Sequence, residues 1–402
     1  MPAPPDGRRL GAAVQFICLL IVIPLVVASC NSTAPTPTPS SGHLKVGLVV
    51  SLTGSGTAGA EPAVQGATVA VADINAQSRA GGGRQLDLVI VDDASNAATA
   101  ERVCSQVARD GAVAIVGSES PTSRAACSRA AGSAHIPYLA AGGSDGTECY
   151  SGTFFTGLVP MQRLSPLVGF LVLRLSAKRI FVVSTNSAAG GAVAAMAARA
   201  ISAGGGVAAG SAAVSPDATQ FDAALAAIAA ARPSVVLDSL VGAEAIAYHK
   251  QFAADPRTRA ITRASLQMQE AEATTIGPGP ADVYIATDYL AADPAGPNQD
   301  WIAALTTKYG DSAIATATGA EAYDAVELLA MSISRAGSAN GPALITTLTT
   351  VSFTGPRGAV SIKPGSHGYA SLATHIGRLN KGRGIDQVEV GAPLDPAVAC
   401  AS

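Results

Sequence analysis

A glycine-rich segment near the start of the chain has the spacing of a nucleotide-binding loop. Residues 54–59 read Gly-Ser-Gly-Thr-Ala-Gly and fit the pattern GxGxxG, in which glycines let the backbone approach a pyrophosphate. Such folds place a ribose-binding acid at the end of the second strand, about 20 residues further on. The acids at that strand end, Asp92 and Asp93, lie 38 and 39 residues after Gly54. The segment is therefore interpreted as a loop, and no cofactor is expected.

Residue patterns for catalysis and for metal binding are missing from the chain. It contains no GxSxG, P-loop, HExxH or SxxK motif, and no CxxC or Cys/His cluster. We therefore predict that the chain is not an enzyme and binds no metal. Glu270 and Glu272 allow two interpretations, either a solvated turn or a Glu270 carboxylate directed into a ligand cleft. The histidines lack a triad-like setting; they are His43, His135, His249, His367 and His375.

Small polar residues follow successive predicted strands. In open α/β sheets, ligands bind outside the carboxyl ends of the strands. Hydroxyl and amide groups in this position offer hydrogen bonds to a neutral or zwitterionic solute without a fixed positive charge. The pattern predicts a ligand cleft. The loops are Ser51-Leu52-Thr53-Gly54, Ser118-Glu119-Ser120, Gly142-Gly143-Ser144-Asp145, Thr185-Asn186-Ser187 and Asp238-Ser239.

Short apolar runs alternate with longer amphipathic segments from His43 onward. In residues 60–77, Val64, Ala67 and Val71 recur at spacings of three and four, which predicts a helix. Strands that alternate with helices indicate βαβ units and a parallel sheet. The first series has strands at 44–50, 86–91, 112–117 and 136–141, and helices at 60–77, 96–109 and 121–134.

The alternation restarts after Pro160, which predicts a second lobe. The tail at 358–378 alternates polar and apolar residues, as antiparallel strands do. The predicted fold class is α/β, with two doubly wound parallel-sheet (Rossmann-like) lobes. The second series has helices at 161–175, 190–203, 218–231 and 242–254, strands at 179–184, 206–213, 234–239, 262–266 and 283–289, and late helices at 298–308, 319–336 and 341–349.

The composition fits this fold class. Of the 402 residues, 48% are hydrophobic but only 4% are aromatic, so the core consists mainly of Ala, Val, Leu and Ile. The length suffices for two domains of ordinary size. The formal net charge is −3 and no Lys/Arg stripe occurs, which argues against nucleic acid as a partner.

The N-terminus has the parts of a secretory signal. Two arginines precede an apolar stretch, residues 10–28, which ends in small residues before Cys30. The alternative is a transmembrane helix, since about 19 apolar residues just span a bilayer, but a glutamine and a proline interrupt the run. The segment 27–30 (VASC) resembles a bacterial lipobox, in which the cysteine receives a diacylglycerol lipid. We expect removal of residues 1–29 and an extracytoplasmic lipoprotein anchored to the cell membrane through Cys30.

Four more cysteines follow the anchor. An even set in an exported protein favours disulfides, with reduced core cysteines as the alternative. The helices that carry Cys104 and Cys127 should lie on one face of a doubly wound lobe, which makes this pair the first choice. Cys149 competes for Cys127, and the fourth is Cys400.

Several segments, taken in order, resemble the periplasmic binding proteins of type 1 fold. They are similar to the branch of leucine/isoleucine/valine-binding and amide/urea-binding proteins, which are substrate-binding lipoproteins of ABC transporters. The resemblance covers about residues 44–392. The segments are VGLVVSLTGSG (46–56), QGATVAVADINAQ (65–77), residues 86–126, GTECYSGTFFTG (146–157), PSVVLDSLVG (233–242), ASLQMQEAE (264–272) and residues 355–379.

The resemblance implies two lobes joined by a hinge of three crossovers. The N-terminal lobe would comprise residues 44–160 plus 287–355, and the C-terminal lobe residues 161–286 plus 356–392. A disordered Pro/Thr/Ser tether, residues 30–43, would precede them, and residues 393–402 would form a tail.

The resemblance also implies a set of ligand-binding residues. From the first lobe these are Ser118, Glu119, Ser120, Gly142 and Ser144, and from the second Thr185, Asn186, Ser187, Asp238 and Gln269 or Glu270. The loops at the strand ends add Ser51, Thr53, Gly143 and Ser239 as candidates. An acid in the second lobe would bind the ammonium of an amino acid. The amide/urea pattern is broken, because its tyrosines near 119, 140 and 187 and its threonine near 142 are Glu, Ala, Ser and Gly here. Glu119 would favour a ligand with a donor or a positive group.

The implied function is capture of a small polar solute, similar to an amino acid, amide or urea, by lobe closure. A monomer would deliver it to the permease and ATPase of an ABC importer. One alternative is a ligand-sensing receptor that signals to a partner protein, since one fold serves both functions. A hydrolase on the same scaffold is the other, and it lacks a nucleophile–base pair.

Overall fold

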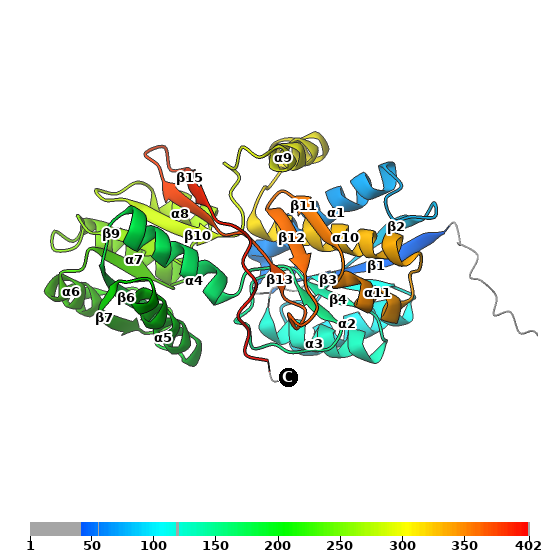
Figure 1. Cartoon of the computed structure of the whole chain (residues 1–402), viewed down its shortest axis with the longest axis horizontal. Helices are drawn as coiled ribbons and strands as arrows, with labels where there is room; N and C mark the ends of the chain where they lie inside the picture. The colour runs from blue at the N-terminus through cyan, green and yellow to red at the C-terminus, as the bar shows by residue number, and fades with distance from the viewer. Residues whose placement is uncertain (1–41, 55, 118–119, 401–402) are drawn as a thin grey trace, which may run out of the picture. The chain divides into compact units, whose positions relative to one another are not determined.

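The computed structural model describes residues 42–54, 56–117 and 120–400 (Figure 1). The predicted signal segment, Cys30 and residues 31–41 of the tether lie outside the described residues, as do Ser118 and Glu119. The predicted tether extends too far, because His43 is the first residue of β1. Within the described ranges, no helix is long and apolar enough to cross a membrane.

The first sheet has five parallel strands in the order β2-β1-β3-β4-β5. Successive side chains of each strand point to opposite faces of the sheet, and both faces are buried. In β1, Val46, Leu48 and Val50 face one core, and Val49, between Leu48 and Val50, faces the other. The strands are β1 (His43–Val50), β2 (Gln85–Asp92), β3 (Ala114–Gly117), β4 (Tyr138–Ala140) and β5 (Thr153–Phe155).

Helices cover both faces of this sheet. One face packs against α1 (Ala60–Ala76), α9 (Gly296–Tyr309), α10 (Ala317–Ala336) and α11 (Gly341–Leu348), and the other against α2 (Ala97–Arg109) and α3 (Pro121–Ser133). Small side chains allow a close fit: a Cβ at Gly47 would collide with the side chain of Val107 on α2. Short 3₁₀ turns are η1 (Thr57–Gly59) and η3 (Gly310–Ser312).

The second sheet has seven strands in the order β15-β14-β10-β9-β8-β6-β7. Five are parallel, and β14 and β15 continue the sheet in antiparallel fashion from β10. The strands are β6 (Arg179–Thr185), β7 (Val207–Val214), β8 (Val235–Asp238), β9 (Thr262–Ser265), β10 (Val283–Thr287), β14 (His375–Leu379) and β15 (Ile385–Val390).

This sheet is also covered on both faces. One core contains α4 (Pro160–Gly169), its π-helical extension Phe170–Arg174, and α5 (Ala188–Ala203). The opposite core contains α6 (Asp222–Ala231) and α7 (Gly242–Ala254), and a smaller cluster includes α8 (Glu270–Ile276). The predicted α/β class with parallel sheets is therefore confirmed.

A small third sheet corrects the predicted boundary of the last segment. Its antiparallel strands are β11 (Ser352–Gly355), β12 (Gly358–Ile362) and β13 (Ala370–Ser371). Val360, Ile362 and Leu372 share the core of β1 and α10, although the family resemblance placed residues 356–392 in the second lobe. Only β14 and β15 join the second sheet. Polar–apolar alternation identifies a strand but does not reveal which sheet it joins.

Two disulfides connect the four cysteines of the described chain. Cys104 on α2 pairs with Cys127 on α3, which was the first choice from the sequence. Cys149 does not compete for Cys127 but pairs with Cys400, 251 residues away. The tail thus returns from β15 to the first lobe, where Leu394 and Leu372 exchange backbone hydrogen bonds.

Candidate functional site

The loop after β1 is held by the loop after β2. Ser51 is buried and donates a hydrogen bond of 2.6 Å from Oγ to Asp93 Oδ1. Thr53 donates from its hydroxyl (2.6 Å) and its backbone N–H (3.2 Å) to the carboxylate of Asp92. The hydroxyl bond lowers the pKa of Asp92. The polar groups of Ser51 and Thr53 therefore fix the shape of this loop.

The ends of three strands of the first sheet meet at a small pocket beside this loop. Its lining includes Ser51, Gly117 at the end of β3 and Ala141 just after β4. Gly117 has a φ of +129°, and a Cβ there would collide with the backbone oxygen of Val49. Glycine is required at this position because only it tolerates both the conformation and the close approach.

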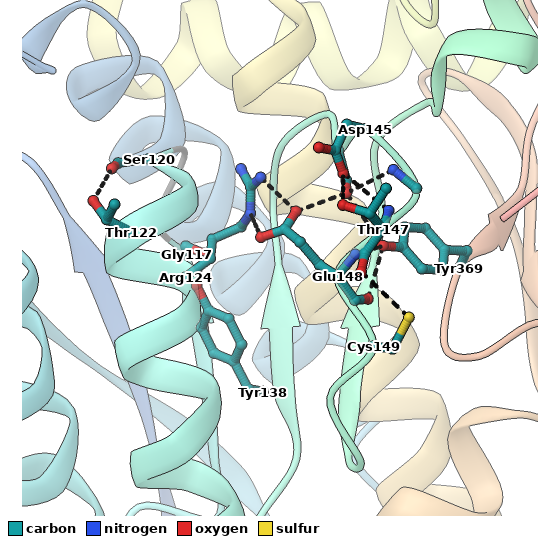
Figure 2. A network of polar contacts seen from close by, with 12 residues as sticks. Gly117, Ser120, Thr122, Arg124, Tyr138, Asp145, Thr147, Glu148, Cys149 and Tyr369 are labelled. Atoms are coloured by element: carbon teal, nitrogen blue, oxygen red, sulfur yellow. Dashed lines mark hydrogen bonds and ion pairs between the residues drawn. The ribbon is translucent and has the colours of Figure 1, made fainter. Parts of the chain in front are cut away.

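Arg124, Glu148 and Tyr369 belong to a polar network that joins distant parts of the first lobe (Figure 2), and Ser144 takes part in it. The Ser144 Oγ donates to Glu148 Oε2 at 2.7 Å and lies 3.2 Å from the hydroxyl of Tyr369. Glu148 forms an ion pair of 2.7 Å with Arg124, which is buried on α3. Tyr369 accepts from the Glu148 N–H and donates to the Glu148 carbonyl. The Ser144 hydroxyl therefore holds the loop after β4.

Burial raises the pKa of Tyr369 to about 12, so its hydroxyl stays protonated at neutral pH and can donate. Arg124, Glu148 and Tyr369 were not identified from the sequence. Glu148 and Tyr369 lie 221 residues apart, so no local pattern connects them.

The remaining first-lobe candidates lie at the ends of β3 and β4. Ser120 precedes the first turn of α3 and contacts the hydroxyl of Thr122 at 3.0 Å, without a side-chain cap to the helix. The first N–H groups of a helix have no partner within the helix, so they can bind an acceptor. Gly142 is buried with a φ of +154°, while Gly143 is exposed.

In the second lobe, the loop after β6 has two exposed candidates, Asn186 and Ser187. Ser187 caps α5 by accepting from the Gly190 N–H at 3.0 Å. The Thr185 hydroxyl donates to Glu244 Oε1 at 3.1 Å. Burial raises the pKa of Glu244. The Asn186 side chain is exposed.

Asp238, at the end of β8, is turned into the lobe. Only 1% of its surface is exposed, and its Oδ1 accepts from Ser265 Oγ at 2.9 Å. His249 Nε2 lies 3.1 Å from its Oδ2. The neighbouring Ser239 has a buried Oγ with no hydrogen-bond partner among the described residues. The acid that the resemblance placed toward the ligand is thus enclosed by protein groups.

Gln269 and Glu270 lie at the start of α8. The Gln269 side chain is exposed. Glu270 is half-buried, and its Oε2 accepts one long hydrogen bond, 3.4 Å, from the N–H of Ala291, on the connection from β10 to α9. Burial raises the pKa of Glu270. The nearby Tyr289 hydroxyl is buried without a hydrogen-bond partner among the described residues, and burial raises its pKa far above the usual value. The partial burial of Glu270 argues against a fully solvated turn.

Across the described ranges, no group of three or more His, Cys, Asp or Glu side chains could hold a metal ion.

Comparison with known proteins identifies the family of the chain. A family model described as periplasmic binding protein matches residues 43–383. No curated protein sequence matches.

Solved structures share the fold over most of the chain at low sequence identity. An amino acid ABC transporter substrate-binding protein from Pseudomonas fluorescens has a TM-score of 0.76 and 19% identity, over 88% of this chain and 96% of that one. A solute-binding protein from R. palustris in complex with 4-hydroxybenzoate has a TM-score of 0.76 and 17% identity, over 88% and 98%. LivJ from Streptococcus pneumoniae, in complex with isoleucine, has a TM-score of 0.71 and 20% identity, over 86% and 99%.

The likeness to these structures concerns the fold, and the family model matches most of the sequence. The chain therefore belongs to the periplasmic binding protein family.

Proposed function

We propose that the chain is an extracytoplasmic binding protein that captures a small solute with an ammonium or amide group and delivers it to an ABC importer. The family match and the neighbours described as ABC transporter substrate-binding proteins support the general role. The mechanism would be lobe closure, because a solute held by both lobes favours the closed state.

The observation that carries the choice of solute is the Glu270 carboxylate. It is half-buried, accepts one long backbone hydrogen bond and lies beside the connection from β10 to α9. A carboxylate in such a position gains most from a cationic or N–H-bearing partner. The other end of the solute would lie on the N–H groups at the start of α3, which suit a carboxylate or a carbonyl.

The solved neighbours bind different chemical classes, since one structure holds isoleucine and another 4-hydroxybenzoate. Hydroxybenzoates carry a carboxylate and a neutral phenolic hydroxyl but no ammonium group, so they offer Glu270 only a neutral donor. An aliphatic amino acid or a short amide fits the Glu270 environment better.

A thermal-shift panel tests this proposal on the purified protein. It comprises urea, short amides, aliphatic and acidic amino acids, polyamines and 4-hydroxybenzoate. A solute at 100 times its dissociation constant should add about 2.7 kcal/mol of stability. We expect a shift with an aliphatic amino acid or an amide and none with 4-hydroxybenzoate. The absence of a thermal shift with every compound of the panel would contradict the proposed function.

We also propose that lipid on Cys30 anchors the protein to the membrane. The short Pro/Thr/Ser tether would keep the lobes near a membrane partner and raise their local concentration there. Replacing Cys30 with Ala should release the protein from the membrane fraction on cell fractionation. If the variant stays in the membrane fraction, the proposed lipid anchor on Cys30 is contradicted.

A further inference from the structure

Two loops of the second lobe carry the candidate residues Ser239, Gln269 and Glu270. The β8 loop, residues 239–242, connects β8 to α7, and the β9 loop, residues 266–270, connects β9 to α8. Because β8 and β9 are neighbouring parallel strands, the two loops lie side by side at the carboxyl edge of the sheet.

Asp238 makes hydrogen bonds that reach both loops. Its Oδ1 accepts from the Leu240 N–H in the β8 loop, at 3.4 Å, and from Ser265 Oγ, at 2.9 Å. Ser265 Oγ in turn accepts from the Met268 N–H in the β9 loop, at 3.3 Å. The backbone oxygen of Asp238 accepts from the Leu266 N–H, at 2.9 Å. One buried residue therefore organises the bases of both loops.

Glu272 joins the same loops near their outer ends. Its Oε1 accepts from the Gly242 N–H at 2.6 Å, and its Oε2 accepts from the Gln269 N–H at 2.8 Å. The two oxygens of one half-buried carboxylate thus bind one backbone donor from each loop. Hydrogen bonds to an ionised acceptor are about twice as strong as neutral ones.

Asp238 is itself held from behind by two buried residues. His249 Nε2 lies 3.1 Å from Asp238 Oδ2, in contact with it although the two atoms are not aligned for a hydrogen bond. Arg263 NH1, which can only donate, lies 3.1 Å from His249 Nδ1 and 2.9 Å from the His249 carbonyl. His249 Nδ1 must therefore be the acceptor, and Nε2 carries the proton that faces Asp238. This arrangement of Arg263, His249 and Asp238 fixes the orientation of the Asp238 carboxylate.

We propose that Asp238 and Glu272 are positioning residues that fasten the β8 and β9 loops into one rigid unit, which presents Ser239, Gln269 and Glu270 to the solute. The inference rests on the proposed function for its purpose, but the clamp itself is a property of the protein without a solute. Neither carboxylate needs to touch the solute. Separate loops would each lose conformational entropy on binding, and a clamped pair has lost it in advance.

The test is backbone amide hydrogen exchange, measured by mass spectrometry on the full-length protein in detergent with no solute added. Asp238→Asn, Ser265→Ala and Glu272→Ala should each accelerate exchange in both loops, by about tenfold or more. Peptides from β6 and α5 should keep their protection. Glu272→Gln, which retains one acceptor oxygen, should lie between Glu272→Ala and the unaltered protein.

Tyr248→Phe is the matched control. Tyr248 is as buried as its neighbour His249 on α7, but its hydroxyl has no hydrogen-bond partner among the described residues. Its removal should leave exchange in both loops unchanged.

Three results would overturn the clamp. Faster exchange in only one loop would mean that the loops are independent. Faster exchange throughout the second lobe would mean that the carboxylates serve only global stability, and unchanged exchange would mean that the contacts hold nothing. If Asp238→Asn fails to fold, Glu272→Ala tests the same coupling from the surface side. Failure of the solute panel would contradict the proposed function without affecting these exchange results.

Discussion

Asp238 and Glu270 show how two acids in neighbouring loops take different roles. Asp238 is enclosed by Ser265, His249 and the Leu240 N–H, so its carboxylate interacts with groups of the protein. Glu270 has one long hydrogen bond, from the Ala291 N–H, and burial raises its pKa. An ionised group with few partners gains the most when a ligand brings a donor.

We predict that Glu270→Gln weakens binding of an ammonium-bearing solute by about tenfold to a hundredfold, because a charge-assisted hydrogen bond becomes a neutral one. Isothermal titration calorimetry with the solute found in the panel measures the change. Glu101→Gln is the matched control, since Glu101 pairs with Arg129 on the surface of α2 and α3. Equal affinity of Glu270→Gln and the unaltered protein would exclude Glu270 from the site.

The same residue predicts the pH dependence of binding. An ammonium group beside Glu270 favours the ionised form, so the pKa of Glu270 is lower in the complex than in the free protein. Binding therefore releases a proton. Affinity should fall as the pH decreases through the raised pKa of free Glu270, and it should level off above that pKa. Titrations between pH 4 and 8, on the order of the range in which a raised carboxyl titrates, should show no such slope for Glu270→Gln.

At the scale of elements, a buried ion cluster ties a lobe connection to a helix of the first lobe. Arg357, between β11 and β12, lies 2.7 Å from Asp288 and 2.8 Å from Asp324, and all three side chains are fully buried. Asp288 directly follows β10, on the chain that leaves the second sheet, and Asp324 lies in α10. Burial raises the pKa of Asp324 to about 6 even with Arg357 adjacent.

Removing Arg357 should destabilise the protein strongly. Arg357→Leu leaves two buried carboxylates without their cation, and breaking a buried pair in this way costs about 3–5 kcal/mol. Urea denaturation followed by circular dichroism measures the loss. Lys363→Ala provides the comparison, because Lys363 and Asp395 form an exposed pair, worth about 0–1 kcal/mol. Similar midpoints for both variants would contradict the structural role of the cluster.

For the whole molecule, the notable feature is the return of the tail to the first lobe. After β15, Leu394 pairs with Leu372 and Asp395 forms an ion pair with Lys363. Cys400 then forms a disulfide with Cys149. Cys149 directly follows Glu148, the partner of Ser144 in the first-lobe network (Figure 2). The tail is thus fastened beside a candidate ligand loop.

We predict that replacing both Cys149 and Cys400 with Ser lowers stability by about 2–4 kcal/mol, because the disulfide closes a long loop in the unfolded chain. Differential scanning calorimetry under non-reducing conditions measures the change in Tm. A peptide map of the oxidised protein checks the pairing beforehand. An unchanged Tm would show that the tail contributes nothing to the stability of the lobe.

The sequence by itself determined the fold class and the strand–helix order. The runs of Val, Ile and Leu in β1, β3 and β8 have one stable environment, a sheet buried on both faces, so their local pattern suffices. Two short elements were not predicted from the sequence. β5 has three residues and α8 has seven, which are too few to show a hydrophobic period. The sequence also predicted that the strand-end loops share one edge of each sheet, because parallel strands bring their carboxyl ends to the same edge.

Only the tertiary structure decided what each polar side chain at that edge does. Ser51, Thr53, Ser144 and Asp238 are polar residues of the kind that bind ligands, yet each already binds another group of the protein. Those partners are 4 to 42 residues away in the chain, and Tyr369 is 225 residues from Ser144. A residue type states which hydrogen bonds a side chain can make. Which of them are already made depends on contacts between loops, and these exist only once both sheets have formed.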